Sequence, residues 1–170
     1  MRISLPNSNT FSKVFFQSLG KEIDNQIKGI ATDSREIQSG DLYIAIPGEN
    51  VDGHSFLKEV FIAGASTALV SSPNDDLKGN QIIVDNTIEA IGKVATKWRE
   101  QYQIPVIGIT GSNGKTSTKE LLRHILSSKF DIHATEGNYN TSIGLPLTLL
   151  QLNAFHGASI LEMGANQKGD

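Results

Sequence analysis

Residues 106–118 have the sequence VIGITGSNGKTST, an apolar run followed by a glycine-rich turn and the polar start of a helix. Glycines in such a turn let successive backbone N–H groups point at one anion, and the following helix N-terminus adds partial positive charge. The stretch therefore predicts a phosphate-binding loop between a buried strand and a helix. Five residues at helical spacing predict the apolar face of that helix: Thr118, Leu121, Leu122, Ile125 and Leu126.

The end of this loop carries the chemistry expected of a nucleotide site. Lys115 can reach the β- and γ-phosphates, and the Thr116 hydroxyl can bind Mg²⁺. The general P-loop pattern has a glycine five positions before Gly114, where this chain has Ile109, so only the Gly-Lys-Thr end and the strand-to-helix setting match. A purely structural turn is the alternative, but it gives no purpose to an exposed Lys-Thr pair.

Downstream of the loop, one carboxylate follows a predicted strand. The apolar run 158–161 is typical of a buried strand, and Glu162 comes directly after it. Ligands bind at the carboxyl ends of strands in open α/β sheets, and a carboxylate there is a suitable oxygen ligand for Mg²⁺. The structural alternative is a solvated loop residue, which is the more common role of a lone glutamate after a strand.

Upstream of the loop, short apolar strands alternate with amphipathic helices, which predicts a small α/β domain. Thr10 is expected to cap a first helix, and Asn86 with Glu89 resembles a capping box at the start of another. The pair Ile104-Pro105 breaks the pattern. We therefore expect one α/β domain over residues 1–103 and the first part of a parallel-sheet P-loop ATPase domain over residues 105–170.

Composition narrows the classes of function. The 170 residues carry a net charge of −3, contain no cysteine and are 38% hydrophobic. The absence of cysteine excludes disulfides, thiolate metal sites and thiol catalysis. No basic run favours nucleic-acid binding, and no apolar segment is long enough for membrane insertion. The N-terminus lacks the basic leader and apolar stretch of a signal peptide, so we expect a cytoplasmic protein.

The loop segment TGSNGKT, residues 110–116, resembles the ATP loop of the Mur ligase family and its folylpolyglutamate synthetase relatives. Three earlier segments resemble the first domain of the two late Mur ligases: residues 32–35, 40–48 and 52–56. Three later segments resemble the branch of the family that adds D-alanyl-D-alanine: residues 134–140, 143–150 and 162–166.

The resemblance implies an ATP- and Mg²⁺-dependent ligase. By family pattern, the enzyme adds D-alanyl-D-alanine to UDP-N-acetylmuramoyl-tripeptide through an acyl phosphate during peptidoglycan precursor synthesis, acting as a monomer. Lys115 and Glu162 would be catalytic, and Thr116 and Glu162 would bind the metal. The triphosphate would be held by residues of the loop and the first helical turn: Gly111, Ser112, Asn113, Gly114, Lys115, Thr116 and Ser117.

The resemblance also implies two sets of substrate contacts. The UDP moiety would be contacted by Ser34, Glu49, Asn50 and Val51, and the peptide and phosphate end by Asn138, Asn140 and Thr141. For the second set, an ordinary Asn/Gly turn before a helix is the structural alternative.

Two other functions stay open at this level. The chain has Thr141 where the D-alanyl-D-alanine branch usually has asparagine, which is closer to the ligase that adds the third stem-peptide residue. A non-catalytic module that binds a nucleotide or a UDP-sugar is the third possibility. Because residues 105–170 are about a third of a complete ATPase domain of this family, we expect this chain alone to be inactive.

Overall fold

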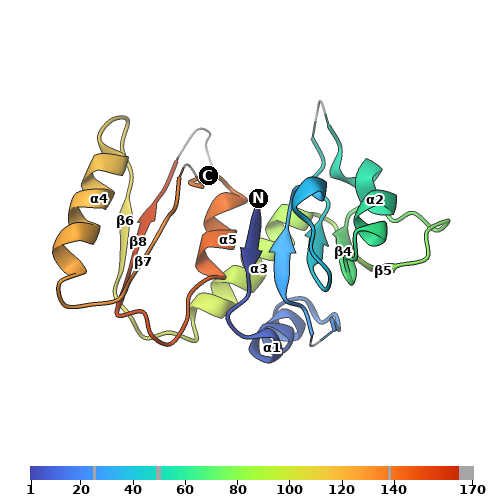
Figure 1. The fold of residues 1–170 in the computed structure, drawn as a ribbon, viewed down its shortest axis with the longest axis horizontal. Coiled ribbons are helices and arrows are strands. Elements are labelled where there is room, and N and C mark those ends of the chain that lie inside the picture. The colour runs from blue at the N-terminus through green and yellow to red at the C-terminus, as the bar shows by residue number, and fades with distance from the viewer. Residues whose placement is uncertain (25, 49–50, 138, 165–170) are drawn as a thin grey trace. The chain divides into compact units, whose positions relative to one another are not determined.

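The computed structural model describes residues 1–24, 26–48, 51–137 and 139–164. The chain divides into two units, Met1–Val94 and Ala95–Asp170, and each has its own β-sheet (Figure 1). The α/β fold class expected from the sequence is confirmed. The division falls within helix α3 (Thr87–Arg99). The domain boundary expected at residues 103–105 stays a prediction.

The first unit contains a five-stranded sheet in the order β1-β2-β3-β4-β5. Its strands are β1 (Arg2–Ser4), β2 (Gly29–Ala31), β3 (Leu42–Ile44), β4 (Thr67–Val70) and β5 (Asn80–Ile83). β1 pairs with β2 in the antiparallel direction, and the other neighbours are parallel. The sequence pattern did not predict β1, because three residues are too few to show an alternation.

Side-chain caps begin two of the three helices of this unit, and the third follows a 3₁₀ turn without such a cap. The helices are α1 (Ser8–Leu19), α2 (Leu57–Ile62) and α3, with 3₁₀ turns η1 (Ser34–Glu36) and η2 (Gly53–Phe56). α1 begins before Thr10, because the Asn7 side chain accepts the Thr10 N–H at 2.9 Å, so the expected cap at Thr10 is wrong. The cap at Asn86 is confirmed: its side chain accepts the N–H groups of Ile88 and Glu89 at 2.9 and 3.1 Å.

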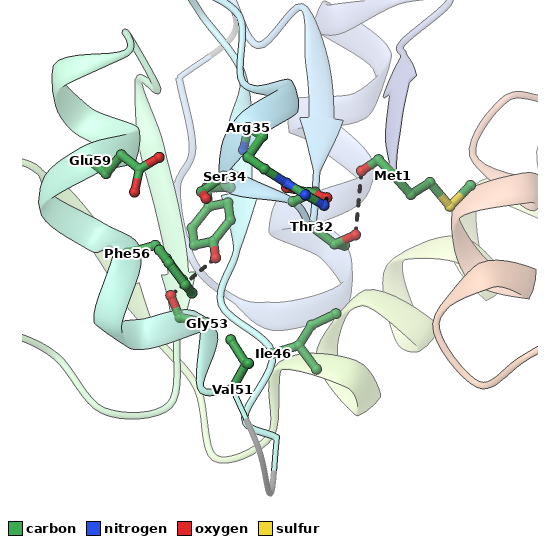
Figure 2. Close-up of a pocket in the computed structure, with 11 residues that line it drawn as sticks. Met1, Thr32, Ser34, Arg35, Ile46, Val51, Gly53, Phe56 and Glu59 are labelled. Atoms are coloured by element: carbon green, nitrogen blue, oxygen red, sulfur yellow. Dashed lines mark hydrogen bonds and ion pairs between the residues drawn. The ribbon is translucent and has the colours of Figure 1, made fainter.

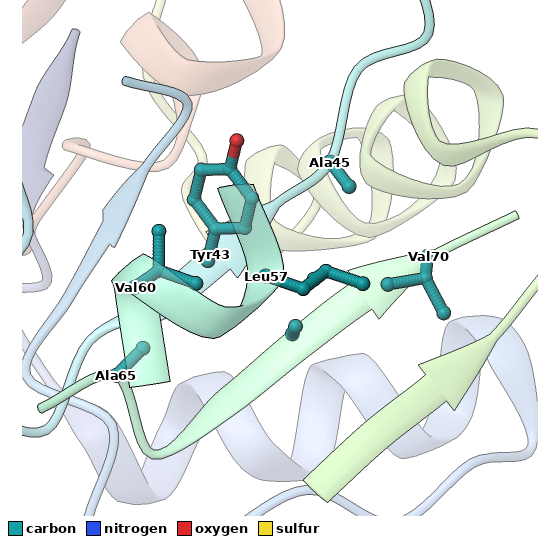
Figure 3. Packing of buried hydrophobic residues seen from close by; sticks show 7 residues of the cluster. Tyr43, Ala45, Leu57, Val60, Ala65 and Val70 are labelled. Atoms are coloured by element: carbon teal, nitrogen blue, oxygen red, sulfur yellow. The ribbon is translucent and has the colours of Figure 1, made fainter. Parts of the chain in front are cut away.

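Both faces of this sheet are buried along its three central strands, β2, β3 and β4. On one face, Tyr43 and Val70 pack against Leu57 and Val60 of α2 (Figure 3). Side chains alternate along a strand, so Leu69 points to the opposite face, where it is fully buried as well. Strands that are covered on both faces are continuously apolar, which explains why β2, β3 and β4 lack polar alternation, whereas the edge strands β1 and β5 carry polar residues.

The second unit contains a three-stranded parallel sheet in the order β6-β8-β7. Its elements are β6 (Val106–Ile109), α4 (Lys115–Leu126), β7 (Ile132–Ala134), α5 (Gly144–Leu149) and β8 (Ala158–Glu162). α4 lies along one side of the sheet (Figure 1). The predicted strand, glycine turn and helix around Gly111 are confirmed. Because β8 lies beside β6, Ile109 pairs with Glu162, and both strands end at the same edge.

The apolar face expected on α4 is present but is not buried. Leu121 is 61% exposed and Ile125 is 56% exposed, whereas the buried residue of the helix is Lys119. The sequence predicted the helix and its apolar stripe, but periodicity identifies a face without showing what lies against it. Within the described part of the chain, no helix is long and apolar enough to cross a membrane.

Candidate nucleotide site

The glycine loop adopts a backbone that its glycines make possible. Gly111 has a φ of 145° and Gly114 a φ of 76°, values that residues with a side chain rarely adopt. Gly114 is the N-cap of α4 and has no side chain to cap the first turn. The backbone N–H groups of that turn therefore face the loop, where a helix N-terminus favours an anion.

The Lys115 side chain folds back onto the glycine loop. Lys115 Nζ donates a hydrogen bond to the Gly111 carbonyl at 2.6 Å, so the ammonium group lies above the turn. Ser112 and Asn113 are exposed within the turn, and Ser117 is exposed on the first turn of α4. The loop thus carries one cation together with several exposed polar side chains.

Glu162 brings three predicted residues together. It is the last residue of β8 and is only 4% exposed. One carboxylate oxygen accepts a hydrogen bond from the Thr116 hydroxyl at 2.9 Å, and the other accepts one from the Asn140 amide at 3.1 Å. Three segments far apart in the sequence therefore meet at the carboxyl edge of the sheet, beside the glycine loop.

The donor groups at this edge fit Mg²⁺. A hydroxyl and a carboxylate are hard oxygen ligands, and Mg²⁺ is usually held by one or two carboxylates together with substrate phosphates. Among the described residues there is no cluster of three or more His, Cys, Asp or Glu side chains that could hold a metal by itself. Thr116 and Glu162 are therefore suited to a metal ion that arrives with a nucleotide.

The remaining residues of the second expected set lie nearby or cannot be placed. The Thr141 hydroxyl accepts the N–H of Gly144 at 3.2 Å, which orders the chain just before α5. Asn138 lies outside the described residues. Sequence reasoning missed Thr135, whose hydroxyl accepts the Glu162 N–H at 3.0 Å. No local signal could have found it, because a threonine at a strand end is common.

A separate cavity of about 660 Å³ lies in the first unit (Figure 2). Ser34 and Val51, two of the four residues expected to contact the UDP moiety, line it; Glu49 and Asn50 lie outside the described residues. The other residues of its wall are Met1, Thr32, Asp33, Arg35, Tyr43, Ile46, Gly53, Phe56 and Glu59.

Polar groups of the cavity wall are fixed by one another. Arg35 donates to both carboxylate oxygens of Asp33, at 2.9 and 2.6 Å, and this contact holds the pKa of Asp33 well below its usual range. The Tyr43 hydroxyl donates to the Gly53 carbonyl at 3.0 Å. Burial raises the pKa of Tyr43 to about 12, so it stays a donor at neutral pH.

A glycine loop between a parallel strand and a helix, with a Thr–Glu oxygen pair at the adjacent strand end, is the arrangement typical of P-loop-type proteins. Two family models match this chain: "Mur ligase family, catalytic domain" over residues 26–108 and "Mur ligase middle domain" over residues 109–170. The chain belongs to the Mur ligase family, as the sequence resemblance predicted.

Two relatives of this chain share one name. The UDP-N-acetylmuramoyl-tripeptide--D-alanyl-D-alanine ligase of Synechocystis sp. is 43% identical over 148 residues, which are 86% of this chain and 33% of that protein. The ligase of that name from Bacillus subtilis is 40% identical over 146 residues, covering 85% of this chain and 32% of that protein. The chain thus spans about a third of the length of these relatives.

Solved structures of Mur ligases have a similar fold. A crystal structure of MurF from Acinetobacter baumannii is 36% identical, with a TM-score of 0.89 over 99% of this chain and 38% of that chain. MurF ligase from Thermotoga maritima in complex with ADP is 32% identical, with a TM-score of 0.75 over 82% of this chain and 33% of that chain. A UDP-N-acetylmuramoyl-L-alanyl-D-glutamate--2,6-diaminopimelate ligase shares only the fold, at 17% identity and a TM-score of 0.58.

Proposed function

We propose that this chain is the nucleotide-binding part of an ATP-dependent ligase that adds D-alanyl-D-alanine to UDP-N-acetylmuramoyl-tripeptide. The ligase would act as a cytoplasmic monomer in peptidoglycan precursor synthesis. The observation that carries the proposal is the 43% identity to a ligase of that name across 86% of this chain.

Two alternatives have less support. The ligase for the third stem-peptide residue is supported by fold alone, through a structure only 17% identical. A non-catalytic binding module would not need the Thr116–Glu162 contact or the lysine over the loop. Both features are intact in this chain, which favours an active phosphate site.

The reaction that we propose has two steps. ATP phosphorylates the carboxylate of the UDP-linked peptide, which gives an acyl phosphate and ADP; the amine of D-alanyl-D-alanine then attacks the acyl carbon and phosphate leaves. Phosphoryl transfer depends mainly on positioning and charge neutralisation. In this chain the first-turn N–H groups of α4 would bind the phosphates, and the Lys115 ammonium would balance their negative charge.

The metal would be bound at the edge of the sheet. When bound, Mg²⁺ would neutralise charge on the β- and γ-phosphates. Thr116 and Glu162 would hold it, and Asn140 would fix the carboxylate by its hydrogen bond at 3.1 Å. Buried as it is, Glu162 has little freedom to turn away from this position.

The cavity of the first unit would take the uridine nucleotide of the substrate. Its volume of about 660 Å³ suits a nucleotide, and its wall offers the Arg35 guanidinium, the Ser34 hydroxyl and apolar surface from Phe56. Arg35 is exposed although it pairs with Asp33. A guanidinium with free N–H groups can also bind a diphosphate.

The test is a calorimetric titration of ATP·Mg²⁺ into the parent chain and into Lys115→Ala. We expect weak binding by the parent and a loss of about tenfold or more in the variant, because a charged hydrogen-bond partner of the phosphates is removed. Lys129→Ala, at an exposed lysine beyond α4, is the matched control and should bind like the parent. Equal affinities for parent and Lys115→Ala would refute the assignment of this loop as the phosphate site.

A further inference from the structure

Lys119 is a buried cation that the proposed reaction does not use. It is 2% exposed, and among the lysines and arginines that the structure describes it is the buried one. Lysine is almost never fully buried unless it has a partner. Its Nζ donates to the Thr135 carbonyl at 2.7 Å and pairs with a Glu120 carboxylate oxygen at 3.1 Å. Because the Glu120 side chain is half exposed, the carbonyl is the buried partner that Lys119 reaches.

Thr135 connects this lysine to the metal-binding carboxylate. It follows β7 directly and is 1% exposed. Its backbone N–H donates to the Ile160 carbonyl at 3.0 Å, and its hydroxyl accepts the backbone N–H of Glu162 at 3.0 Å. The carbonyl of the same residue accepts from Lys119. Thr135 therefore fixes the end of β8 from one side while Lys119 holds Thr135 in place.

The contacts form one hydrogen-bond network that links Thr116, Lys119, Thr135 and Glu162. Lys119 lies three residues after Thr116, so both side chains leave the same face of α4. Thr116 binds the Glu162 side chain, and Lys119 binds the Glu162 backbone through Thr135. The N-terminal half of the helix is thereby attached to the strand end at two points, which sets the rotation of the helix relative to the carboxylate.

We propose that Lys119 is a positioning residue for the Thr116–Glu162 oxygen pair, and hence for the divalent cation that binds there with the nucleotide. The proposal rests on the proposed function of this site. Without Lys119, the helix keeps its glycine loop and its phosphate-binding N–H groups. What is lost is the second attachment, so the hydroxyl and the carboxylate no longer have a fixed separation.

The first experiment separates metal binding from nucleotide binding. Lys119→Met removes the donors and the charge but keeps an apolar chain of similar length. The affinity for Mn²⁺ in the presence of ATP is measured by electron paramagnetic resonance, and the affinity for metal-free ATP by calorimetry with a chelator. We expect Mn²⁺ affinity to fall about tenfold or more, the range seen when groups that support metal ligands are removed. Metal-free ATP affinity should stay within about twofold.

Two control variants show whether the effect is merely structural. Ile160→Val weakens the packing of the same strand, where the Ile160 side chain is fully buried, and keeps the backbone carbonyl that accepts from Thr135. Lys97→Met removes a half-exposed lysine that pairs with Glu100. Neither should change the ratio of the two affinities. Unchanged Mn²⁺ affinity in a folded Lys119→Met chain, or a parallel fall of both affinities, would overturn the proposal.

A second measurement needs no ligand and distinguishes this proposal from the function on which it rests. In the ligand-free chain, Lys119→Met should shift the ¹³C resonance of the Glu162 carboxyl group and the methyl resonance of Thr116, and the two controls should not. If both resonances stay in place, the positioning role is refuted. If they shift while the parent binds no ATP·Mg²⁺, the positioning role stands and the proposed nucleotide site fails.

Discussion

Helices α3 and α4 have similar apolar stripes in the sequence, but their surroundings in the structure differ. α3 buries Ile91, Val94 and Trp98 completely. α4 leaves Leu121 61% exposed and Ile125 56% exposed, and its buried residue is a lysine. The comparison teaches that periodicity specifies a helix and the orientation of its apolar face. Whether another element covers that face depends on residues far away in the sequence.

The largest test of this comparison is Trp98→Ala. Trp98 is fully buried, its Nε1 donates to the Leu152 carbonyl at 3.1 Å, and its ring packs on Tyr102 with centroids 5.9 Å apart. Removal leaves a cavity and an unpaired carbonyl, so we expect a loss of about 3–5 kcal/mol in the free energy of unfolding. Urea titration followed by circular dichroism measures it. The control, Trp98→Phe, keeps most of the buried aromatic surface and should lose less free energy of unfolding. A loss below about 1 kcal/mol for the alanine variant would show that α3 is no better covered than α4.

The pH dependence of stability tests whether water reaches the buried His133 ring in the second unit. His133 on β7 is 6% exposed; its Nε2–H donates to the Thr148 carbonyl at 2.9 Å, and its Nδ1 accepts from the Ser159 hydroxyl at 2.8 Å. Burial lowers the pKa of His133 from 6.5 to about 4. Between these two values the unfolded chain binds more protons than the folded chain. The contribution of neutral His133 to the free energy of unfolding is therefore complete above pH 6.5. It is lost as the pH falls towards 4, by about 3 kcal/mol in all.

The measurement is the free energy of unfolding at pH 7 and at pH 4.5, for the parent and for His133→Asn. The variant has no titrating group at this position, so its stability should fall less between the two pH values, whatever its absolute stability. Parallel losses in the two proteins would mean that water reaches the His133 ring in the folded state.

The smallest effect is expected on the outer face of α4. Leu121→Gln replaces an exposed apolar side chain by a good helix former, so the free energy of unfolding should change by no more than about 0.5 kcal/mol. Leu122→Gln, at the half-buried neighbour on the same helix, is the matched control and should cost more. If Leu121→Gln costs more than about 1.5 kcal/mol, the face is covered in solution. Repeating the titration at lower protein concentration would then show whether a second copy covers it.

Local features were predictable because their causes are local. The glycine loop needs left-handed or unusual φ values at Gly111 and Gly114, and only glycine adopts these freely. The Asn86 cap depends on groups within three residues of it. The placement of Glu162 at a strand end followed from the apolar run before it. The roles assigned to these residues in binding ATP and Mg²⁺ stay predictions that the titrations above can decide.

The features that failed or were missed depend on distant partners. Asn7 caps α1 where Thr10 was expected, because both residue types can cap and only the path of the chain selects one. Strand β1 forms because β2 offers it a pairing edge, not because three residues prefer that conformation. Lys119 points into the protein, towards a carbonyl 16 residues later in the sequence, and none of its neighbours along the chain indicates that partner.

The sequence by itself determined the alternation of strands and helices, the glycine loop before a helix, the family, and the position of Glu162 at the end of a strand. These follow from side-chain spacing and from backbone preferences within a few residues. Only the tertiary structure decided that Thr116, Asn140 and Glu162 meet, because β8 inserts between β6 and β7 and so joins segments 22 and 46 residues apart. The same insertion places Lys119 and Thr135 behind that carboxylate, since hydrogen bonds between distant segments depend on how the strands are ordered and not on the spacing of residues along the chain.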